Sequence, residues 1–438
     1  MLPGCLASVR GAVDEIVLVD TGSVDRTREL AQAVGARVSE RPWRDFADAR
    51  NTALALATGD FILQIDADER LCAGAGAALR AMAARGELDV GMLRLHDADR
   101  LDAVPEEVLS GRARIGPPFR IGRFFRRMPG LAYRGSVHEN LDDSLAALRA
   151  RIGGVEADIL HLGNLPSLRA ALGKDERNML LLKRQWAEEP EDVTAAGYLA
   201  LELVQSGEVA EAARVAEEAW ARLPDQPSHR SVHRLALARA AAALRVGAPA
   251  RALEAVRVAG ERMGRRVDFD FLAGTALVAL ALEHPPGTRR SELARRAARA
   301  HARATERDAS PAAEQLVREA SPVGCEVRRG CALLVACAPR EALAVFESAL
   351  EMDPASEEAR LGMAEACTLL DQPQRALAAV EPLLGAGPDA WVVAAHAARR
   401  AGDMVTADAL LARARERARH GFASAHRREA LSAGGKGT

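Results

Sequence analysis

The chain has 438 residues, which exceeds the usual size of one hydrophobic core and predicts two or more domains. It carries 59 basic and 61 acidic residues, for a formal net charge of −2. This balance excludes a global field that would gather nucleic acid or an anionic membrane. Aromatic residues make up only 3% of the chain. Its many alanine, leucine and arginine residues favour helix.

The six cysteines form no CxxC pair and show no metal-ligand spacing. They indicate unpaired thiols in a reducing cytoplasm. No apolar run reaches the ~18 residues that span a bilayer, so no transmembrane segment is expected. The sequence therefore predicts a cytoplasmic protein.

Residues 1–165 alternate short apolar runs with helical patterns. Strands are expected at Glu15–Asp20, Arg37–Ser39 and Phe61–Ile65, and helices at Ala7–Val13, Asp25–Val34 and Phe46–Ala57. Strands that alternate with helices of about ten residues predict βαβ units and a mostly parallel sheet. Functional residues collect beyond the carboxyl ends of such strands. Here those ends carry Asp20 and the segment Asp66–Glu69.

From about Pro190 the pattern becomes purely helical and repetitive. Ala342, Phe346, Ala349 and Pro354 recur as Ala376, Val380, Leu383 and Pro388, an offset of 34 residues. This is the tetratricopeptide period. Gly207, Gly247 and Gly402 each stand five residues before a small residue, which predicts a turn with positive φ. Five or six degenerate repeats are expected between about 193 and 420, with 284–330 fitting the period worst.

The stretch DEIVLVDTGS to LQIDADE, residues 14–69, resembles family-2 glycosyltransferases of the GT-A fold. The likeness is to the bacterial subgroup that carries tetratricopeptide repeats, and it continues through FRIGRFFRRMPGLAYRGSVHENL and HLGN…GKDERNMLLLKRQ. It implies an α/β, Rossmann-like GT-A domain with a mostly parallel sheet at 1–190. An all-α tetratricopeptide-type solenoid at 191–425 and a disordered tail at 426–438 complete the expected organisation.

Members of this family begin with a strand such as SL-x-MIV-x-NEE. Met1 falls where the family already has its first helix, so we expect the given sequence to be truncated at its amino terminus and to lack that first strand. The favoured explanation is a translation start that lies upstream. The alternative is a decayed gene product.

Asp66 and Asp68 lie at i and i+2 on a loop that leaves a buried strand, where both carboxylates can reach one divalent cation. Oxygen ligands suit Mg or Mn, which can neutralise a departing diphosphate. The alternative is an acidic turn that closes the strand. The resemblance places a donor- or metal-facing histidine at His161, which can otherwise be structural.

The resemblance implies that Asp20 accepts a hydrogen bond from a uracil-like base, so a UDP-sugar is the expected donor. Ser23 and Asp25 are expected to cap the following helix instead. For Arg50 and Asn51 the resemblance suggests contact with the donor diphosphate or support of the Asp66–Asp68 loop. A polar helix face explains these two residues equally well.

An inverting transfer needs one base that takes the acceptor proton. Glu139 is the candidate, with Asp142 and Asp143 in reserve; alternatively, Glu139 only orients His138. Lys174, Arg177 and Asn178 lie on one helix face. That face can approach the diphosphate or pair with acidic residues of the first repeat.

Together these features predict a metal-dependent, inverting glycosyltransferase with a nucleotide-diphosphate sugar as donor. The repeats would present a protein, peptide or glycan acceptor, since such arrays form concave binding surfaces. No nucleic acid partner is expected. The alternative is a non-catalytic repeat scaffold with a degenerate transferase head.

Overall fold

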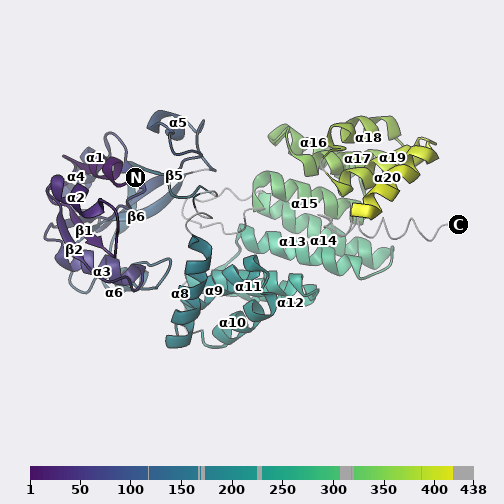
Figure 1. The fold of residues 1–438 in the computed structure, drawn as a ribbon. Coiled ribbons are helices and arrows are strands. Elements are labelled where there is room, and N and C mark those ends of the chain that lie inside the picture. Colours follow the sequence, from purple (N-terminus) through teal and green to yellow (C-terminus); the bar gives the residue numbers. More distant parts are fainter. Residues whose placement is uncertain are drawn as a thin grey trace. The chain divides into compact units, whose positions relative to one another are not determined.

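The computed structural model describes residues 1–116, 118–165, 168, 173–223, 229–305, 317, 320–385 and 387–417. The chain divides into two compact units, Met1–Leu199 and Ala200–Thr438, and each is described by itself (Figure 1). The predicted tail 426–438 and the predicted end of the repeats beyond 417 lie outside the described residues.

The first part of unit one contains the predicted elements in the predicted order. They are α1 (Leu2–Val9), β1 (Val17–Asp20), α2 (Thr27–Ala33), β2 (Arg37–Glu40), α3 (Phe46–Leu56) and β3 (Phe61–Leu63). Asp45 caps α3, because its carboxylate accepts a hydrogen bond of 2.8 Å from the Asp48 amide. Asp25 accepts one of 3.0 Å from the amide of Thr27, the first residue of α2. The N-cap position of α2 is Arg26, without a side-chain capping hydrogen bond, so Asp25 contacts the first turn from one residue earlier.

The rest of unit one adds four strands and the helices between and after them. They are β4 (Glu69–Leu71), α4 (Ala75–Arg85), β5 (Val90–Asp97), α5 (Pro105–Leu109), β6 (Phe119–Arg126), α6 (Asp142–Ala147), β7 (Ile152–His161) and α8 (Lys174–Glu188). Helix α9 (Val193–Ser206) begins in unit one and ends in unit two.

The strands form two sheets, and the larger sheet is mixed. Strands β1 and β2 pair in parallel as a two-stranded sheet, while the five-stranded sheet has the order β3-β6-β5-β7-β4. In the larger sheet β5 and β7 are parallel, and the other three pairs are antiparallel. The prediction of a mostly parallel sheet is therefore wrong. The consecutive strands β5 and β6 pair antiparallel, which needs no long crossover helix.

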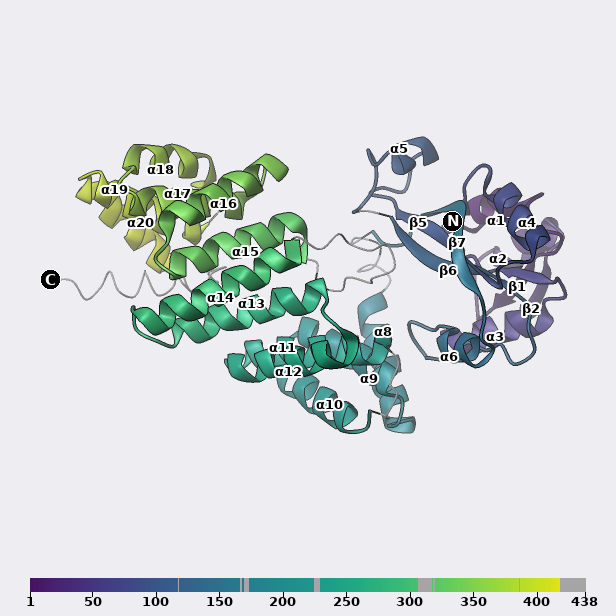
Figure 2. The ribbon, with the colours of Figure 1, turned by 180° about the vertical axis from the view of Figure 1, so that it is seen from behind.

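Helices cover both faces of the five-stranded sheet, as Figure 2 lets the reader follow from behind. On one face α1 and α4 pack against the strands through Val9, Leu79 and Met82. Phe124 belongs to this core, whereas the next residue, Phe125, belongs to a second core with α3 and α6. Successive side chains of a strand point to opposite faces, so the domain has a layer of helices on each side.

From α9 onward the described chain is helical. The helices follow one another in pairs as α9/α10 (Val209–Ala221), α11 (His229–Arg245)/α12 (Pro249–Met263), α13 (Val267–Leu282)/α14 (Thr288–Thr305), α15 (Pro322–Val335)/α16 (Pro339–Met352), α17 (Glu357–Leu369)/α18 (Pro373–Val380) and α19 (Pro388–Arg400)/α20 (Met404–Arg417). A short 3₁₀ helix, η2 (Glu381–Leu383), follows α18. Gly207, Gly247 and Gly402 have φ of +89°, +72° and +89° in the turns within pairs. The predicted role of these glycines is confirmed.

The small residues that define the repeat are packing positions. Ala342, Phe346 and Ala349 of α16 are all fully buried. A Cβ added at Gly330 of α15 would lie 2.6 Å from the Phe346 ring, and one added at Gly362 of α17 would lie 2.2 Å from it. Two glycines therefore make room for one aromatic ring between three helices. No helix in the described residues is long and apolar enough to cross a membrane.

Candidate active site

Asp66 follows β3 and is held by two arginines. Its carboxylate accepts hydrogen bonds of 2.9 and 3.3 Å from Arg50 of α3 and one of 3.0 Å from Arg123 of β6. Burial alone would raise the pKa of Asp66, but the guanidinium groups of Arg123 and Arg50 outweigh it and lower the pKa well below its usual range. Asp66 is therefore an ionised carboxylate with arginine partners on both oxygens.

Each of the two arginines that bind Asp66 also binds a second carboxylate. Arg123 also donates to buried Glu69 at 2.5 Å, and Glu69 accepts a bond of 2.9 Å from the Asp66 amide. On the other side, Arg50 Nε donates to Oε1 of Glu139. The result is a chain of alternating charges, Glu69–Arg123–Asp66–Arg50–Glu139. It joins β4, β6 and α3 to the turn that carries Glu139.

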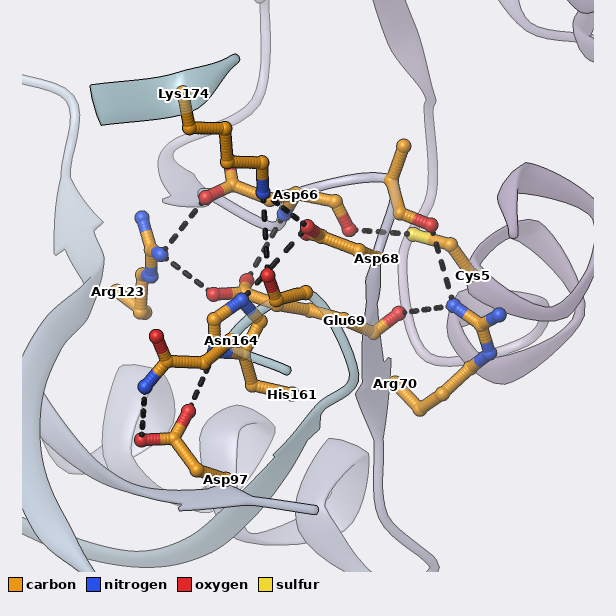
Figure 3. A network of polar contacts seen from close by, with 12 residues as sticks. Cys5, Asp66, Asp68, Glu69, Arg70, Asp97, Arg123, His161, Asn164 and Lys174 are labelled. Atoms are coloured by element: carbon orange, nitrogen blue, oxygen red, sulfur yellow. Dashed lines mark hydrogen bonds and ion pairs between the residues drawn. The ribbon is translucent and has the colours of Figure 1, made fainter. Parts of the chain in front are cut away.

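Asp68 lies on the same loop, in contact with a different group of residues (Figure 3). Its Oδ2 lies 3.8 Å from His161 Nε2 and 3.9 Å from Lys174 Nζ, and Lys174 also donates to the Gly163 carbonyl at 3.2 Å. A Cβ added at Gly163 would lie 1.8 Å from Asp68 Oδ2 and 2.9 Å from His161 Nε2. The Asp68 carboxylate therefore occupies the place that a side chain at residue 163 would fill, so the absence of a side chain at Gly163 lets Asp68 approach His161.

His161 is oriented by residues that the sequence did not single out. Its Nδ1 lies 2.6 Å from Oδ1 of Asp97, and Asn164 donates to the other oxygen of Asp97 at 3.1 Å. Burial works against the charged imidazole, but Asp68 and Asp97 raise the pKa of His161 to about 9. Asp97 ends the alternating apolar run of β5, beside the end of β7. The run at Val90–Asp97 is the sequence signal that could have found it.

A divalent cation would find two protein ligands here rather than a closed cage. Within the described ranges, no group of three His, Cys, Asp or Glu side chains converges as a metal site. The candidate pair is Asp68 with His161, which contact each other, while Asp66 is engaged by its arginines. Magnesium is commonly held by one or two carboxylates together with substrate phosphates. An ion held here with the help of a diphosphate would have to displace the proton that Asp68 and Asp97 keep on the His161 imidazole.

Glu139 lies in a turn, residues 134–140, that is closed by paired hydrogen bonds of 3.0 Å between the backbones of Arg134 and Asn140. His138 in this turn has φ of +55°, a left-handed conformation that is uncommon outside glycine. Asn51 accepts from the Tyr133 amide at 2.8 Å and donates to the Tyr133 carbonyl at 2.9 Å. Asn51 therefore supports the segment that leads into the Glu139 turn.

Two other predicted residues, Asp20 and Arg177, contact residues outside this group. Asp20 ends β1 in the two-stranded sheet, where it accepts from the Ser23 amide at 2.9 Å and lies 3.4 Å from Arg28. Hydrogen bonds from Ser23 lower the pKa of Asp20. The Arg177 guanidinium lies over the Phe46 ring, 5.0 Å from its centroid. The structure thus gives both residues protein partners of their own.

Two segments of the chain, one in each half, are similar to known protein families. Residues 1–84 match the family described as glycosyl transferase family 2, and residues 338–401 match the tetratricopeptide repeat. The chain carries a family 2 glycosyl transferase segment and tetratricopeptide repeats.

A TPR repeat-containing protein of Synechococcus elongatus is 36% identical over 221 residues, which are 49% of this chain and 52% of that protein. An uncharacterized glycosyltransferase of Rickettsia felis is 42% identical over 64 residues, 15% of this chain and 23% of that protein. This chain therefore spans about half of the first relative and under a quarter of the second. A tetratricopeptide repeat protein from Parabacteroides merdae aligns over 60% of this chain and 93% of its own, with 14% identity and a TM-score of 0.44.

Proposed function

We propose that the protein transfers a sugar from a nucleoside-diphosphate donor, a UDP-sugar, to an acceptor hydroxyl or thiol, with inversion at the anomeric carbon. The acceptor would be a protein, peptide or glycan that the repeats present. The observation that carries the proposal is the close approach of Asp68 to His161 over Gly163, next to the Lys174 ammonium and beside the carboxylate–arginine chain. The family 2 match over residues 1–84 supports the reaction class.

On the donor side, Asp68 and His161 would hold Mg or Mn together with the donor diphosphate. When bound, the cation would neutralise charge on the departing diphosphate. Asp97 fixes the ring of His161, so that Nε2 is the nitrogen turned toward Asp68. Lys174 adds a positive charge at the same place, suited to a phosphate oxygen. Asp20 would bind the uracil and Arg177 the diphosphate only after exchanging their present partners.

On the acceptor side, Glu139 would take the acceptor proton. Arg50 holds Oε1 of Glu139, which leaves Oε2 as the basic oxygen. The acceptor oxygen or sulfur forms the new bond to the anomeric carbon, while the bond from that carbon to the diphosphate oxygen breaks. The proton moves to Glu139, and the nucleoside diphosphate leaves with the bonding electrons. One carboxylate that is held in place satisfies the need of an inverting transfer for a single base.

The test is donor binding and hydrolysis by the full chain. Binding of UDP, and hydrolysis of UDP-glucose, UDP-galactose and UDP-N-acetylglucosamine, would be measured with Mn, with Mg and with chelator. We expect Mn- or Mg-dependent binding that Asp68→Ala weakens by at least about 10-fold. Glu139→Gln should retain UDP binding and lower the rate of hydrolysis by roughly 10²-fold or more. Equal UDP binding by the unchanged chain and Asp68→Ala would contradict the proposed donor site.

One observation favours a second function, that of a non-catalytic scaffold. Arg50 and Arg123 occupy the carboxylate of Asp66, the first of the two acidic residues that were expected to share the ion. In that case the repeats alone would act, by binding a protein partner. Failure of the full chain to bind any nucleoside diphosphate with Mn or Mg would favour this alternative.

A further inference from the structure

Helix α8 contacts the candidate site at both of its ends. Lys174, its first residue, approaches Asp68 and the Gly163 carbonyl. Gln185, near its other end, accepts a hydrogen bond of 2.7 Å from the Ser136 amide in the Glu139 turn. The two positions are eleven residues apart, or about 16 Å along a helix. The donor side and the acceptor side of the site are thus connected through one rigid element.

Ser136 is held on both sides of its peptide. Its amide donates to Gln185, and its carbonyl accepts from the Phe46 amide at 3.2 Å, at the start of α3. Gln185 is buried, and its amide group donates to Asp192 Oδ2 at 2.7 Å. The other oxygen of Asp192 accepts from the Thr194 amide at 3.1 Å, at the start of α9. Gln185 therefore has a defined rotamer, with both ends of its amide satisfied.

A second contact ties the same turn to α9. The ring of His138 stacks on Tyr198, with centroids 4.2 Å apart and planes at 14°. His138 is the residue with the left-handed backbone, directly before Glu139. Such a conformation persists only where surrounding contacts hold it. The helices that lead into the repeats thus maintain the shape of the turn that carries the proposed base.

We propose that Gln185 is a positioning residue, which fixes the Glu139 turn from α8 and so sets the position of the Glu139 carboxylate. This inference rests on the proposed function for the role of Glu139. A displacement of about 1 Å in a catalytic group can cost 10²-fold in rate. Loss of the Gln185 contact should therefore lower the catalytic rate while donor binding at Asp68 and His161 is retained.

The first experiment measures hydrogen exchange of the segment 133–141 in the full chain. Gln185→Met keeps the volume of the side chain but removes the acceptor for Ser136, so exchange of this segment should become at least about 10-fold faster. Leu180→Ala is the control on the same helix, at a residue that is 71% exposed. It should leave the exchange unchanged. Unchanged exchange in Gln185→Met overturns the inference, whatever the role of Glu139.

The second experiment is a double-mutant cycle on the hydrolysis of the UDP-sugar that the donor panel identifies. Gln185→Met should lower kcat roughly 10- to 100-fold, but should cost nothing further in the Glu139→Gln background, because Gln185 acts through Glu139. Losses that multiply in the double variant overturn the inference. If Glu139→Gln retains full kcat, the proposed base is wrong, while faster exchange in Gln185→Met would still show that Gln185 holds the turn.

A rescue variant separates positioning from simple loss of packing. Gln185→Glu combined with Asp192→Asn reverses the hydrogen bond between these two side chains and keeps an acceptor for Ser136. The asparagine can still cap α9. We expect this pair of changes to restore slow exchange and most of kcat, whereas Gln185→Glu alone should not, because it places two carboxylates 2.7 Å apart. A rescue variant as impaired as Gln185→Met would contradict the positioning role.

Discussion

The carboxylate of Asp68 and the imidazole of His161 face each other across 3.8 Å, from Oδ2 to Nε2. The two residues lie 93 positions apart in sequence, and they meet because β4 pairs antiparallel with β7, with Glu69 opposite His161. This register brings the loop before β4 next to the end of β7. Gly163, just after β7, has no side chain, and the Asp68 carboxylate occupies the place that a Cβ would take.

Gly163→Ala should therefore abolish metal-dependent UDP binding. The added Cβ would lie 1.8 Å from Asp68 Oδ2, a distance that no relaxation of the Cβ alone can relieve. The carboxylate would have to leave the side of His161. Calorimetric titration with UDP and Mn is the measurement.

The matched control is Gly122→Ala on β6, next to Arg123. A Cβ there meets Met92 and Val90 at 3.5 Å, which is ordinary van der Waals contact. This variant should bind UDP as the unchanged chain does. Full UDP binding by Gly163→Ala would contradict the proposed role of the Asp68–His161 pair in donor binding.

The two acidic residues of the loop should differ in their effect on stability. Asp66→Ala leaves Arg50 and Arg123 without their shared partner, and removal of one partner from a largely buried ion network is strongly destabilising. Because the Asp66 side chain is partly exposed, we expect a loss of about 2–3 kcal/mol. Asp68→Ala should cost less than about 1 kcal/mol. The thermal melting temperatures of both variants measure this difference in stability. Equal melting temperatures for Asp66→Ala and Asp68→Ala would contradict the prediction.

The sequence predicted the part of the fold that depends on local pattern. The order from α1 to β3 follows from apolar runs and helical periods, and the glycines at 207, 247 and 402 follow from the φ that a tight turn needs. The loop with Asp66 and Asp68 was found because it directly follows a recognisable strand. These features each lie within a few residues of the signal that predicts them.

What the sequence did not reveal depends on contacts between distant strands. Arg123 meets Asp66 across 57 residues, and Asp97 meets His161 across 64. Both contacts are set by the mixed pairing of β5, β6 and β7, which periodicity within one segment does not encode. The repeat pattern placed the boundary at 190, whereas the structure divides the chain after Leu199. The first part of α9 lies in unit one, where Tyr198 stacks on His138.

The turns within the repeat pairs offer a test by substitution. Cys337 and Asp371 occupy the turn position that Gly207, Gly247 and Gly402 fill elsewhere, with φ of +57° and +61°. A side chain in this conformation costs roughly 1 kcal/mol. Cys337→Gly should therefore raise the free energy of unfolding by up to about 1 kcal/mol, and Gly402→Ala should lower it by a similar amount. Denaturation followed by helical circular dichroism measures both, and a destabilised Cys337→Gly would contradict the argument.

The last prediction concerns His301, which is fully buried between α13 and α14. Its ring packs on Phe271 and against Gly274, and neither ring nitrogen has a hydrogen-bond partner in the described part of the chain. Burial lowers the pKa of His301 to about 3, and Arg328 acts in the same direction. The pKa in the folded state thus lies below the unfolded value of about 6.5. The contribution to stability is fully present above pH 6.5 and is lost as the pH falls.

Between about pH 6.5 and 5, the free energy of unfolding should fall by about 1 kcal/mol per pH unit through His301, because only the unfolded chain takes up the proton. His301→Leu removes the pH dependence that His301 causes, and it also removes the two unpartnered ring nitrogens. At pH 5 this variant should therefore melt at a higher temperature than the unchanged chain. His284→Leu, in the turn between the same two helices, is the control and should retain the dependence. The midpoint of the helical transition is measured from pH 7.5 to 5. An identical pH dependence in His301→Leu and the unchanged chain would show that His301 does not resist protonation in the folded array.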